Sequence, residues 1–151
     1  MEFEEQFVTK EIAEKLKAIK FNKPCFEAFD NENPSIGSFM LYDTWRRFSN
    51  NSTRYTLRPT WKQAIDWLTK EYKIFVKIMP LDFEGKVKWY YECQSIELVK
   101  SPHSEHKVFK FKTPKYNINS SNYLATKRGV LEALNTILKE DMAKKERKKL
   151  K

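Results

Sequence analysis

The sequence predicts an α+β fold with the element order α-β-β-β-α-β-β-β-α, for three reasons. Three segments repeat apolar residues at the spacing of an amphipathic helix. Six shorter segments are rich in β-prone residues or alternate between apolar and polar side chains. The connections between successive strands are short, which favours antiparallel pairing. We therefore expect an antiparallel sheet with helices packed on one face.

The chain has 151 residues, the usual size of one domain, and we expect a single domain over residues 1–143 followed by a basic tail over residues 144–151. At this length folding buries roughly 68–70% of the surface of the unfolded chain, so no disulfide or structural metal is needed. The two cysteines, Cys25 and Cys93, stand in apolar surroundings. We expect both to be reduced and buried, because a free cysteine behaves as a small hydrophobic residue.

The first helix is expected over residues 9–20, where apolar residues recur at helical spacing. Thr9 is suited to cap its start, and Asn22 and Pro24 are expected to end it. The three short strands that follow are expected at residues 25–29, 39–42 and 54–57.

The second helix has the clearest start signal. Thr60 and Gln63 stand three residues apart, the spacing of a capping box, and Pro59 precedes them. We expect the helix to begin at Thr60 and to bury one apolar face, made by Trp61, Ile65, Leu68 and Tyr72.

Three further strands are expected at residues 74–79, 86–98 and 107–113, with Pro80 ending the first and residues 82–85 forming a hairpin connection. In the second of these strands, alternation places Val87, Trp89, Tyr91 and Cys93 on one face and Lys88, Tyr90, Glu92 and Gln94 on the other.

The last helix is expected to start at Ser121 or Asn122 and to end at about Ala143. Its predicted buried stripe consists mainly of leucines: Leu124, Leu131, Leu134 and Leu138, supported by Val130 and Ile137.

The sequence contains no enzyme motif that stands out. Its three glycines form no phosphate-binding loop. His103 and His106 have the spacing of a metal-binding pair, but they lie in an expected loop without further ligands, so we expect solvated histidines. A nucleophile–base pair would have to use Cys93 with His106, and Cys93 belongs to the apolar face of its strand. We expect no enzymatic activity, no cofactor and no bound metal.

The positive charge is distributed unevenly along the chain. Residues 1–72 contain eleven basic and eleven acidic residues, and residues 116–143 contain three of each. Residues 73–115 contain nine lysines and five acids, and residues 144–151 contain six basic residues and one glutamate. The surplus therefore lies in the middle of the chain and in the tail, and a charge acts over only about 8 Å in physiological salt.

These basic residues are the candidates for contacts with nucleic acid, because lysine and arginine attract phosphates by counterion release. Two alternatives remain open: a solvated sheet face whose lysines protect an edge, and a tail that serves solubility. The candidates are Lys73, Lys77, Lys88, Lys110, Lys112, Lys127, Arg128, Lys144, Lys145, Arg147, Lys148 and Lys149.

The aromatic residues are suited either to a core or to stacking on bases. For Trp61, Trp67, Trp89 and Tyr91 their periodicity favours the core. Tyr90 differs, because strand alternation places it between Lys88 and Glu92 on the polar face.

The start of the sequence is acidic and lacks the basic segment and apolar run of a secretory signal, and no apolar run is long enough to span a membrane. We expect a protein of the cytoplasm or, if phage-encoded, of a virion.

Residues 55–68 contain the pattern L-x-P-T-x-x-x-A-x-x-W. Together with Pro24-Cys25-Phe26, Lys88-Trp89-Tyr90-Tyr91 and the leucines of residues 125–138, this pattern resembles a family of small proteins of uncharacterised function from Bacteroides and their crAss-like phages and prophages. The resemblance covers about residues 12–138 and implies a source and a fold. It implies no functional residues.

From Thr60 onward, the order α-β-β-β-α resembles in its topology the double-stranded RNA-binding domain, which carries lysines at the start of its last helix. Lys127 and Arg128 occupy that region here, and Asn119-Ser120-Ser121-Asn122 stands where that family has a glycine-serine-lysine-lysine turn.

The leading hypothesis is a non-enzymatic module that binds DNA, RNA or another polyanion. The alternative is a phage accessory or virion component whose partner is another phage or host protein.

Overall fold

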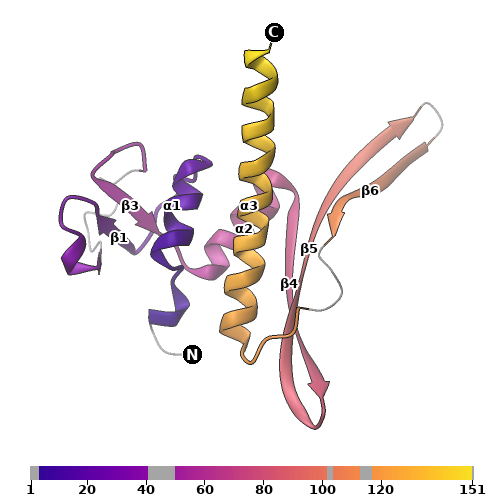
Figure 1. Ribbon diagram of the computed structural model, residues 1–151, viewed down its shortest axis with the longest axis horizontal. Coiled ribbons are helices and arrows are strands. Elements are labelled where there is room, and N and C mark those ends of the chain that lie inside the picture. The colour runs from indigo at the N-terminus through magenta and orange to yellow at the C-terminus, as the bar shows by residue number, and fades with distance from the viewer. Residues whose placement is uncertain (1–3, 41–49, 102–103, 113–116, 151) are drawn as a thin grey trace. The chain divides into compact units, whose positions relative to one another are not determined.

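The computed structural model describes residues 4–40, 50–101, 104–112 and 117–150, and over residues 96–101 and 104–112 it describes the backbone alone. In chain order its elements are η1 (Glu4–Gln6), α1 (Lys10–Ala18), β1 (Glu27–Asp30), η2 (Pro34–Ile36), β2 (Ser38–Met40), β3 (Tyr55–Arg58), α2 (Trp61–Tyr72), β4 (Ile74–Phe83), β5 (Lys86–Ser101), β6 (Ser104–Lys112) and α3 (Asn122–Lys149) (Figure 1).

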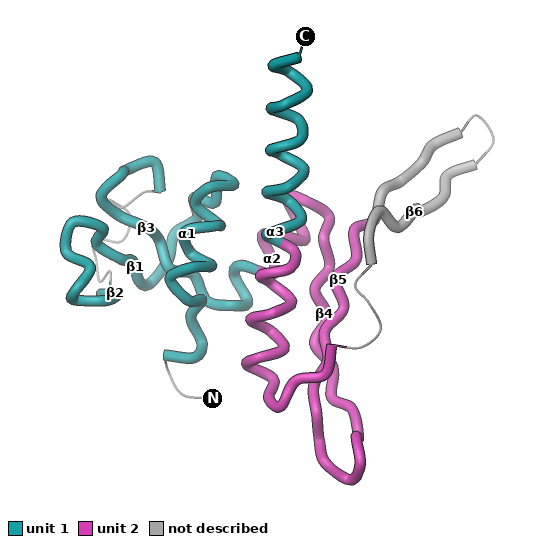
Figure 2. The backbone as a smooth tube through the Cα atoms, in the orientation of Figure 1, with its two compact units in different colours: residues 1–64, 134–151 teal, residues 65–133 magenta. Residues whose placement is uncertain are grey.

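This order confirms the predicted α+β fold. The described strands form two three-stranded antiparallel sheets, with the strand orders β2-β1-β3 and β4-β5-β6, a division that the sequence pattern does not reveal. The chain divides into two compact units (Figure 2). The first unit comprises residues 1–64 and 134–151, and the second comprises residues 65–133.

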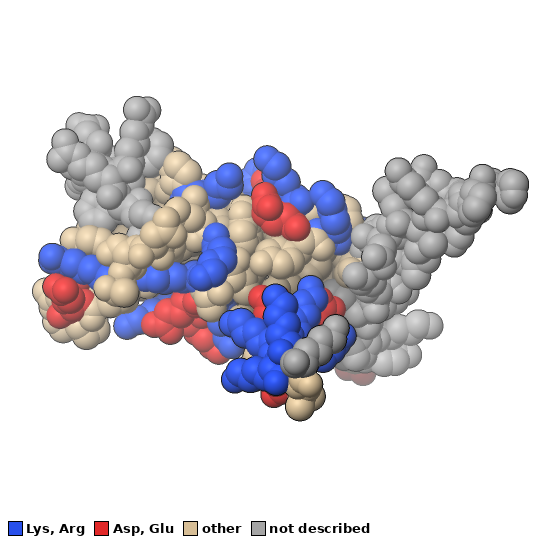
Figure 3. All heavy atoms as spheres, turned by 90° about the horizontal axis from the view of Figure 1, so that it is seen from above, with Lys and Arg blue, Asp and Glu red and all other residues tan. Residues whose placement is uncertain are grey.

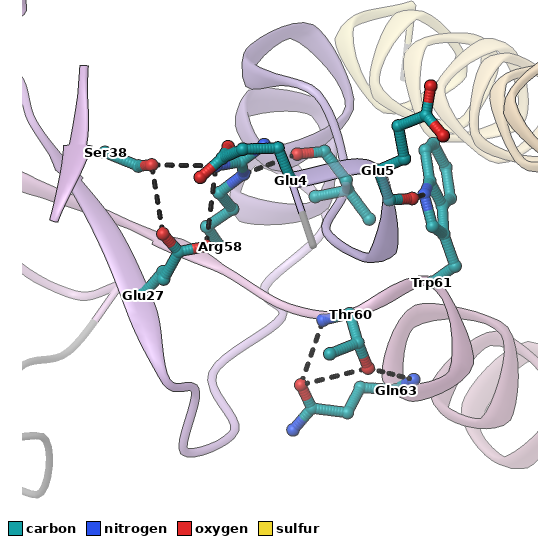
Figure 4. Close-up of polar contacts among 9 residues, drawn as sticks. Glu4, Glu5, Glu27, Ser38, Arg58, Thr60, Trp61 and Gln63 are labelled. Atoms are coloured by element: carbon teal, nitrogen blue, oxygen red, sulfur yellow. Dashed lines mark hydrogen bonds and ion pairs between the residues drawn. The ribbon is translucent and has the colours of Figure 1, made fainter. Parts of the chain in front are cut away.

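Both predicted helix caps are confirmed. The hydroxyl oxygen of Thr9 accepts a hydrogen bond from the N–H of Ile12 at 3.4 Å. At the start of α2, the N–H of Gln63 donates to the hydroxyl of Thr60 at 3.2 Å, and the N–H of Thr60 donates to the side-chain oxygen of Gln63 at 3.0 Å. These reciprocal bonds form a capping box and satisfy donors that a helix start leaves unpaired (Figure 4).

The prediction that Asn22 and Pro24 end the first helix is wrong. The helix stops earlier because Lys20 adopts a left-handed conformation, with φ of 74°. The N–H of Phe21 then bonds back to the carbonyl of Leu16 at 3.0 Å. This arrangement is a Schellman motif, in which the two apolar side chains that flank the turn, Leu16 and Phe21, are both fully buried.

A buried arginine connects several elements of the first unit (Figure 4). Arg58 at the end of β3 is only 9% exposed. Burial raises the pKa of Glu27, and the charge of Arg58 opposes that rise. The guanidinium is well supplied with acceptors: the carbonyl of Val8 at 2.8 Å, the hydroxyl of Ser38 at 2.7 Å, and the carboxylates of Glu4 at 2.9 Å and Glu27 at 3.4 Å.

The predicted apolar face of α2 is buried at Trp61 and Leu68, while Ile65 and Tyr72 are half-buried. The indole N–H of Trp61 donates to the carbonyl of Glu5 at 2.8 Å, so this ring fills the core with its polar atom satisfied.

The prediction that Pro80 ends its strand is wrong, because β4 continues to Phe83. Pro80 is tolerated since β4 lies at the edge of its sheet, where a missing N–H removes no bond to a second neighbour. The turn to β5 consists of Glu84 and Gly85, with φ of 53° and 77°. Positive φ at both central positions is the signature of a type I′ turn, which suits the twist of a hairpin.

The strand predicted at residues 107–113 begins earlier, at Ser104. Ser104, Glu105 and His106 therefore lie in a strand and not in the expected loop, because β5 extends to Ser101 and offers them a backbone partner. His103 lies outside the described residues.

The last helix begins as predicted, with the hydroxyl of Ser121 accepting from the N–H of Leu124 at 3.2 Å. Its buried stripe is smaller than predicted: Leu134, Val130 and Ile137 are buried, but Leu124, Leu131 and Leu138 are only half-buried. The other buried positions carry small residues, namely Ala125, Thr126, Gly129 and Ala133.

The predicted end of α3 at Ala143 is wrong, because the helix continues through Lys149. Two physical effects favour this extension. Glu140 and Asp141 stand four residues before Lys144 and Lys145, the spacing at which opposite charges stabilise a helix. Basic residues in the last turn also complement the negative end of the helix dipole.

Leu68→Ala is expected to lower the free energy of unfolding by about 2–5 kcal/mol, because the side chain is fully buried and its loss leaves a cavity. Urea denaturation followed by circular dichroism measures the change. Glu71→Ala, at an exposed position of the same helix, is the control and should change stability by less than about 0.5 kcal/mol. An equally small effect for Leu68→Ala would contradict the buried face.

Candidate functional site

The side chains of β4 and β5 alternate between two faces of the second sheet. The register pairs Val76 with Cys93 and Ile78 with Tyr91, so these residues share one face. Tyr91 and Cys93 are buried on it, as strand alternation predicts. The first half of α3 lies along this face, and the hairpin turn projects past the start of the helix (Figure 2).

The helix approaches this face most closely at Gly129. A Cβ atom added there would lie 3.0 Å from Cγ1 of Val76 and 3.2 Å from Cβ and Cγ of Tyr91. Such separations are tighter than ordinary van der Waals contact, so a side chain at this position would push the helix off the sheet. Glycine costs about 1 kcal/mol relative to alanine within a helix, and the close packing offsets that cost.

Two side-chain hydrogen bonds reinforce the contact between β5 and α3. The thiol of Cys93 donates to the carbonyl of Gly129 at 3.1 Å, and the hydroxyl of Tyr91 donates to the carboxylate of Glu132 at 2.6 Å. Burial raises the pKa of Tyr91, and the Glu132 carboxylate raises it further by accepting a hydrogen bond from the hydroxyl and by its negative charge. The phenol is thus held in its neutral, donating form.

Residues 117–119 cover the side of β5 that faces away from β4. The N–H and carbonyl of Trp89 bond to the carbonyl and N–H of Asn119 at 2.9 and 2.7 Å. The side chain of Asn117 accepts from the N–H of Tyr91 at 2.8 Å and donates to its carbonyl at 2.7 Å. Since β5 is bonded on both sides here, the accessible edge of this part of the sheet belongs to β4.

The opposite face of the β4–β5 hairpin is accessible to solvent, and we name it the open face. Among its aromatic and aliphatic members, Phe75 is 36% exposed and Met79 and Phe83 are each 42% exposed, while Leu81 and Tyr90 are half-buried. The register defines its ten side chains as the pairs Phe75–Gln94, Lys77–Glu92, Met79–Tyr90, Leu81–Lys88 and Phe83–Lys86.

The open face is basic. It carries three lysines, Lys77, Lys86 and Lys88, against one acid, Glu92, which stands opposite Lys77. Within the described part of the chain, none of the three lysines forms a salt bridge or donates a side-chain hydrogen bond. The hydroxyl of Tyr90 donates to the sulfur of Met79 at 3.2 Å, which holds the ring across the hairpin.

The structure thus brings together two of the predicted candidates, Lys77 and Lys88, and adds Lys86 to them. Lys73 directly precedes β4 in a left-handed conformation, with φ of 57°, and its amine donates to the carbonyl of Lys70 at 2.9 Å. The side chains of Lys110 and Lys112 lie outside the described residues. Their backbones belong to β6, where Lys112 is paired with Gln94.

Lys127 and Arg128 are not part of the open face, because they lie on α3, which covers the opposite face of the sheet. The guanidinium of Arg128 donates to the side-chain oxygen of Asn119 at 2.5 Å. Arg128 therefore helps to hold the segment that pairs with β5.

The predicted tail residues form a second basic surface, the helical end of α3. All of them are exposed, and Figure 3 shows basic side chains clustered around this end of the helix. Lys144 and Lys148 continue the stripe that is buried at Val130 and Ile137. At this end of the helix, charged residues take the place of the apolar stripe. Lysines are therefore exposed at the positions that are buried in the earlier turns. The surface comprises Lys144, Lys145, Arg147, Lys148 and Lys149.

The remaining candidates, which are the two cysteines, a metal site and a pocket, have less support than the two basic surfaces. Cys25 and Cys93 are free and buried, as predicted, and burial raises the pKa of each thiol to about 12. Among the described residues, no group of three or more histidine, cysteine, aspartate or glutamate side chains is placed to hold a metal ion. A pocket of the first unit, at Pro24, Cys25, Phe26 and Gln63, has no acid–base pair in its lining.

None of the helices in the described part of the chain combines the length and the apolar character that a membrane span requires.

Comparisons of the chain with protein families, with curated proteins and with solved structures found no match.

Sequence reasoning missed the aromatic half of the open face. Tyr90 was expected on a polar face, but Phe75, Met79 and Phe83 were not identified as exposed. The sequence does contain a signal for this exposure. Phe75, Lys77 and Met79 are two residues apart and therefore share one face of a strand, and a lysine between two apolar residues on one face indicates the solvent side.

Gly129→Leu is expected to destabilise the protein by about 1–3 kcal/mol or more, because the new side chain has no space against Val76 and Tyr91. Thermal unfolding followed by circular dichroism measures the effect. Lys139→Leu, at an exposed position of the same helix, is the matched control and should leave the melting temperature nearly unchanged. A Gly129→Leu variant as stable as this control would show that α3 does not pack closely on β5.

Both cysteines are expected to resist alkylation in the folded protein. Raising the pKa of a thiol from 9.0 to about 12 lowers its thiolate fraction at pH 8 by about a thousandfold, and burial also blocks access. Iodoacetamide labelling followed by mass spectrometry should modify both residues in urea and neither in buffer. Rapid labelling of Cys93 in buffer would contradict its buried position.

Proposed function

We propose that this protein is a non-enzymatic module that binds nucleic acid or another polyanion through the open face and the helical end of α3. One observation carries the proposal: the open face interleaves three lysines with exposed apolar and aromatic side chains and contains only one acid. A surface of this composition attracts the phosphate groups of a nucleic acid through its lysines. Its aromatic side chains also offer stacking contacts to the bases.

The state of the lysines supports this proposal. A lysine that is already paired with a carboxylate gains little from a phosphate, because it must first give up its partner. Lys77, Lys86 and Lys88 have no such ion pair among the described residues. Arg58 in the first unit is the opposite case, since two carboxylates, a hydroxyl and a carbonyl already accept from its guanidinium.

The helical end of α3 supports it as well. Five basic residues within residues 144–149 stand on a regular helix, with one glutamate among them. Residues 144–149 span about 8 Å along the helix axis, which is about one Debye length in physiological salt, so neighbouring charges among them act together on a polyanion.

The source remains the one that the sequence resemblance implies, a bacterium of the Bacteroides group or one of its phages, with the protein in the host cytoplasm or in a virion. The topological likeness of the chain from Thr60 onward to a double-stranded RNA-binding domain also remains a prediction. Lys127 would serve it from the first half of α3, while Arg128 is engaged with Asn119.

The alternative partner is another phage or host protein, and one observation favours it. β4 is a ten-residue strand at the edge of its sheet and carries the exposed Phe75, Met79 and Phe83. Edge strands of this kind pair with strands of other chains. Pro80 opposes such pairing, because it presents no N–H. A stoichiometric complex with one protein that withstands salt would support this alternative.

Binding to nucleic acid is expected to weaken steeply as salt increases, because each phosphate contact adds about −0.7 to the slope of log K against log salt on a single strand and about −0.9 on a duplex. Replacing Lys77, Lys86 and Lys88 together by glutamine should flatten the slope by about 2. Fluorescence anisotropy with labelled DNA and RNA between 50 and 200 mM salt measures both quantities. Deleting residues 144–151 should also weaken binding and flatten the slope without lowering the melting temperature.

The matched control replaces Lys10, Lys23 and Lys139 by glutamine. These exposed lysines lie outside the open face, and their loss lowers the net charge equally. Equal effects of the two triple variants would show that total charge, and not the open face, governs binding. Failure of the intact protein to bind any DNA or RNA at 50 mM salt and micromolar concentration would overturn the proposal.

A further inference from the structure

We infer that the nucleic acid bound on the open face is single-stranded, with its bases stacked on the rings of Phe75, Tyr90 and Phe83. This inference rests on the proposed function and names the form of nucleic acid that the same surface would select. It is argued from the spacing of the rings, the position of the lysines between them and the groups that the open face lacks.

The three rings form a row along the hairpin. Phe75 and Phe83 are eight residues apart on β4, which corresponds to about 26 Å at 3.3 Å per residue. Tyr90 stands opposite Met79, the residue midway between them. Neighbouring strands lie about 4.8 Å apart, so all three rings fall within a narrow strip. Such a row provides three separate platforms on which bases can stack.

The lysines occupy the intervals between these rings. Lys77 lies between Phe75 and the Met79–Tyr90 pair, and Lys88, opposite Leu81, lies between that pair and Phe83. Lys86 stands opposite Phe83 at the end of the row. The order is therefore ring, lysine, ring, lysine, ring. This order is complementary to a single strand, in which negatively charged phosphates separate bases whose flat faces are accessible.

A duplex suits the open face less well. In a duplex the flat faces of the bases are stacked on one another, so only base edges and phosphates are accessible in the grooves. Base edges are recognised mainly by arginine, lysine, asparagine and glutamine side chains that form paired hydrogen bonds. Besides its three lysines, which also serve phosphates, the open face has no arginine and offers Gln94 as its only amide, and the hydroxyl of Tyr90 is engaged with Met79. Its exposed phenyl rings would meet phosphates and would gain nothing from them.

Anisotropy measurements with three labelled ligands test the inference at constant salt: a 20-nucleotide thymidine oligomer, a blunt 20-base-pair duplex, and an abasic oligomer with the same number of phosphates as the first. We expect the thymidine oligomer to bind at least about tenfold more tightly than either of the others, because stacking on one ring contributes about 5- to 150-fold in affinity.

The decisive variants remove a ring and keep an apolar side chain. Phe75→Leu and Tyr90→Leu are each expected to weaken binding of the thymidine oligomer by about 5- to 150-fold, without changing binding of the abasic oligomer or the salt slope. Tyr90→Phe keeps the ring and should retain the affinity. Phe26→Leu, which removes a ring that is 61% exposed in the first unit, is the matched control and should have no effect. Circular dichroism confirms that each variant is folded.

The outcomes separate this inference from the proposed function. If the duplex binds as tightly as the single strand, or if the ring variants bind normally while the lysine variants do not, the inference is overturned and the proposed function stands. If no nucleic acid binds in a salt-dependent manner, both are overturned. Loss of affinity for thymidine oligomers alone, on removal of either ring, supports the inference.

Discussion

The packing of α3 against the second sheet at Gly129 determines which side of the β4–β5 hairpin is accessible. Because Gly129 has no side chain, the helix backbone lies against Val76 and Tyr91, and the thiol of Cys93 reaches a helix carbonyl. Strand pleating then assigns every neighbouring residue to one of two faces. A register shift of one residue would bury the lysines and expose Tyr91 and Cys93, so the interaction also specifies the register. The composition of the open face follows from this single contact.

Arg58 and the lysines of the open face differ in how their charges are compensated. In the first unit, Arg58 is buried and surrounded by acceptors from the start of the chain, β1 and β2, so its charge is used within the fold. A buried charge of this kind is costly unless its hydrogen bonds are complete, and here they are well supplied. In the second unit, Lys77 and Lys86 of the open face are exposed and Lys88 is half-buried, and none of the three forms a salt bridge among the described residues. The charge of Arg58 is therefore balanced inside the fold by Glu4 and Glu27, whereas the lysines of the open face have no ion pair among the described residues.

Exposed rings on an edge strand carry a risk of self-association, and the structure contains two features that reduce it. Pro80 interrupts the row of donors on the edge of β4, and the lysines of the open face add like charge that opposes contact between two copies. These features leave the flat of the sheet accessible while they disfavour strand pairing at its edge.

The sequence by itself determined the elements, because their signals are local. The capping box at Thr60 and Gln63, the cap at Thr9 and the alternation along β5 all act between residues a few positions apart, and the structure confirms them. The sequence also located the surplus charge and placed Tyr90 on a polar face. It did not predict the left-handed turn at Lys20 that ends α1, the passage of β4 through Pro80 or the strand at Ser104–His106, because each depends on a backbone conformation or a partner strand that no local pattern encodes. The division into two sheets, the exposure of Phe75 and Phe83 and the separation of Arg128 from the open face likewise required the tertiary structure. Alternation shows that a strand has two faces, but only the packing of α3 at Gly129 decides which of the two faces water reaches.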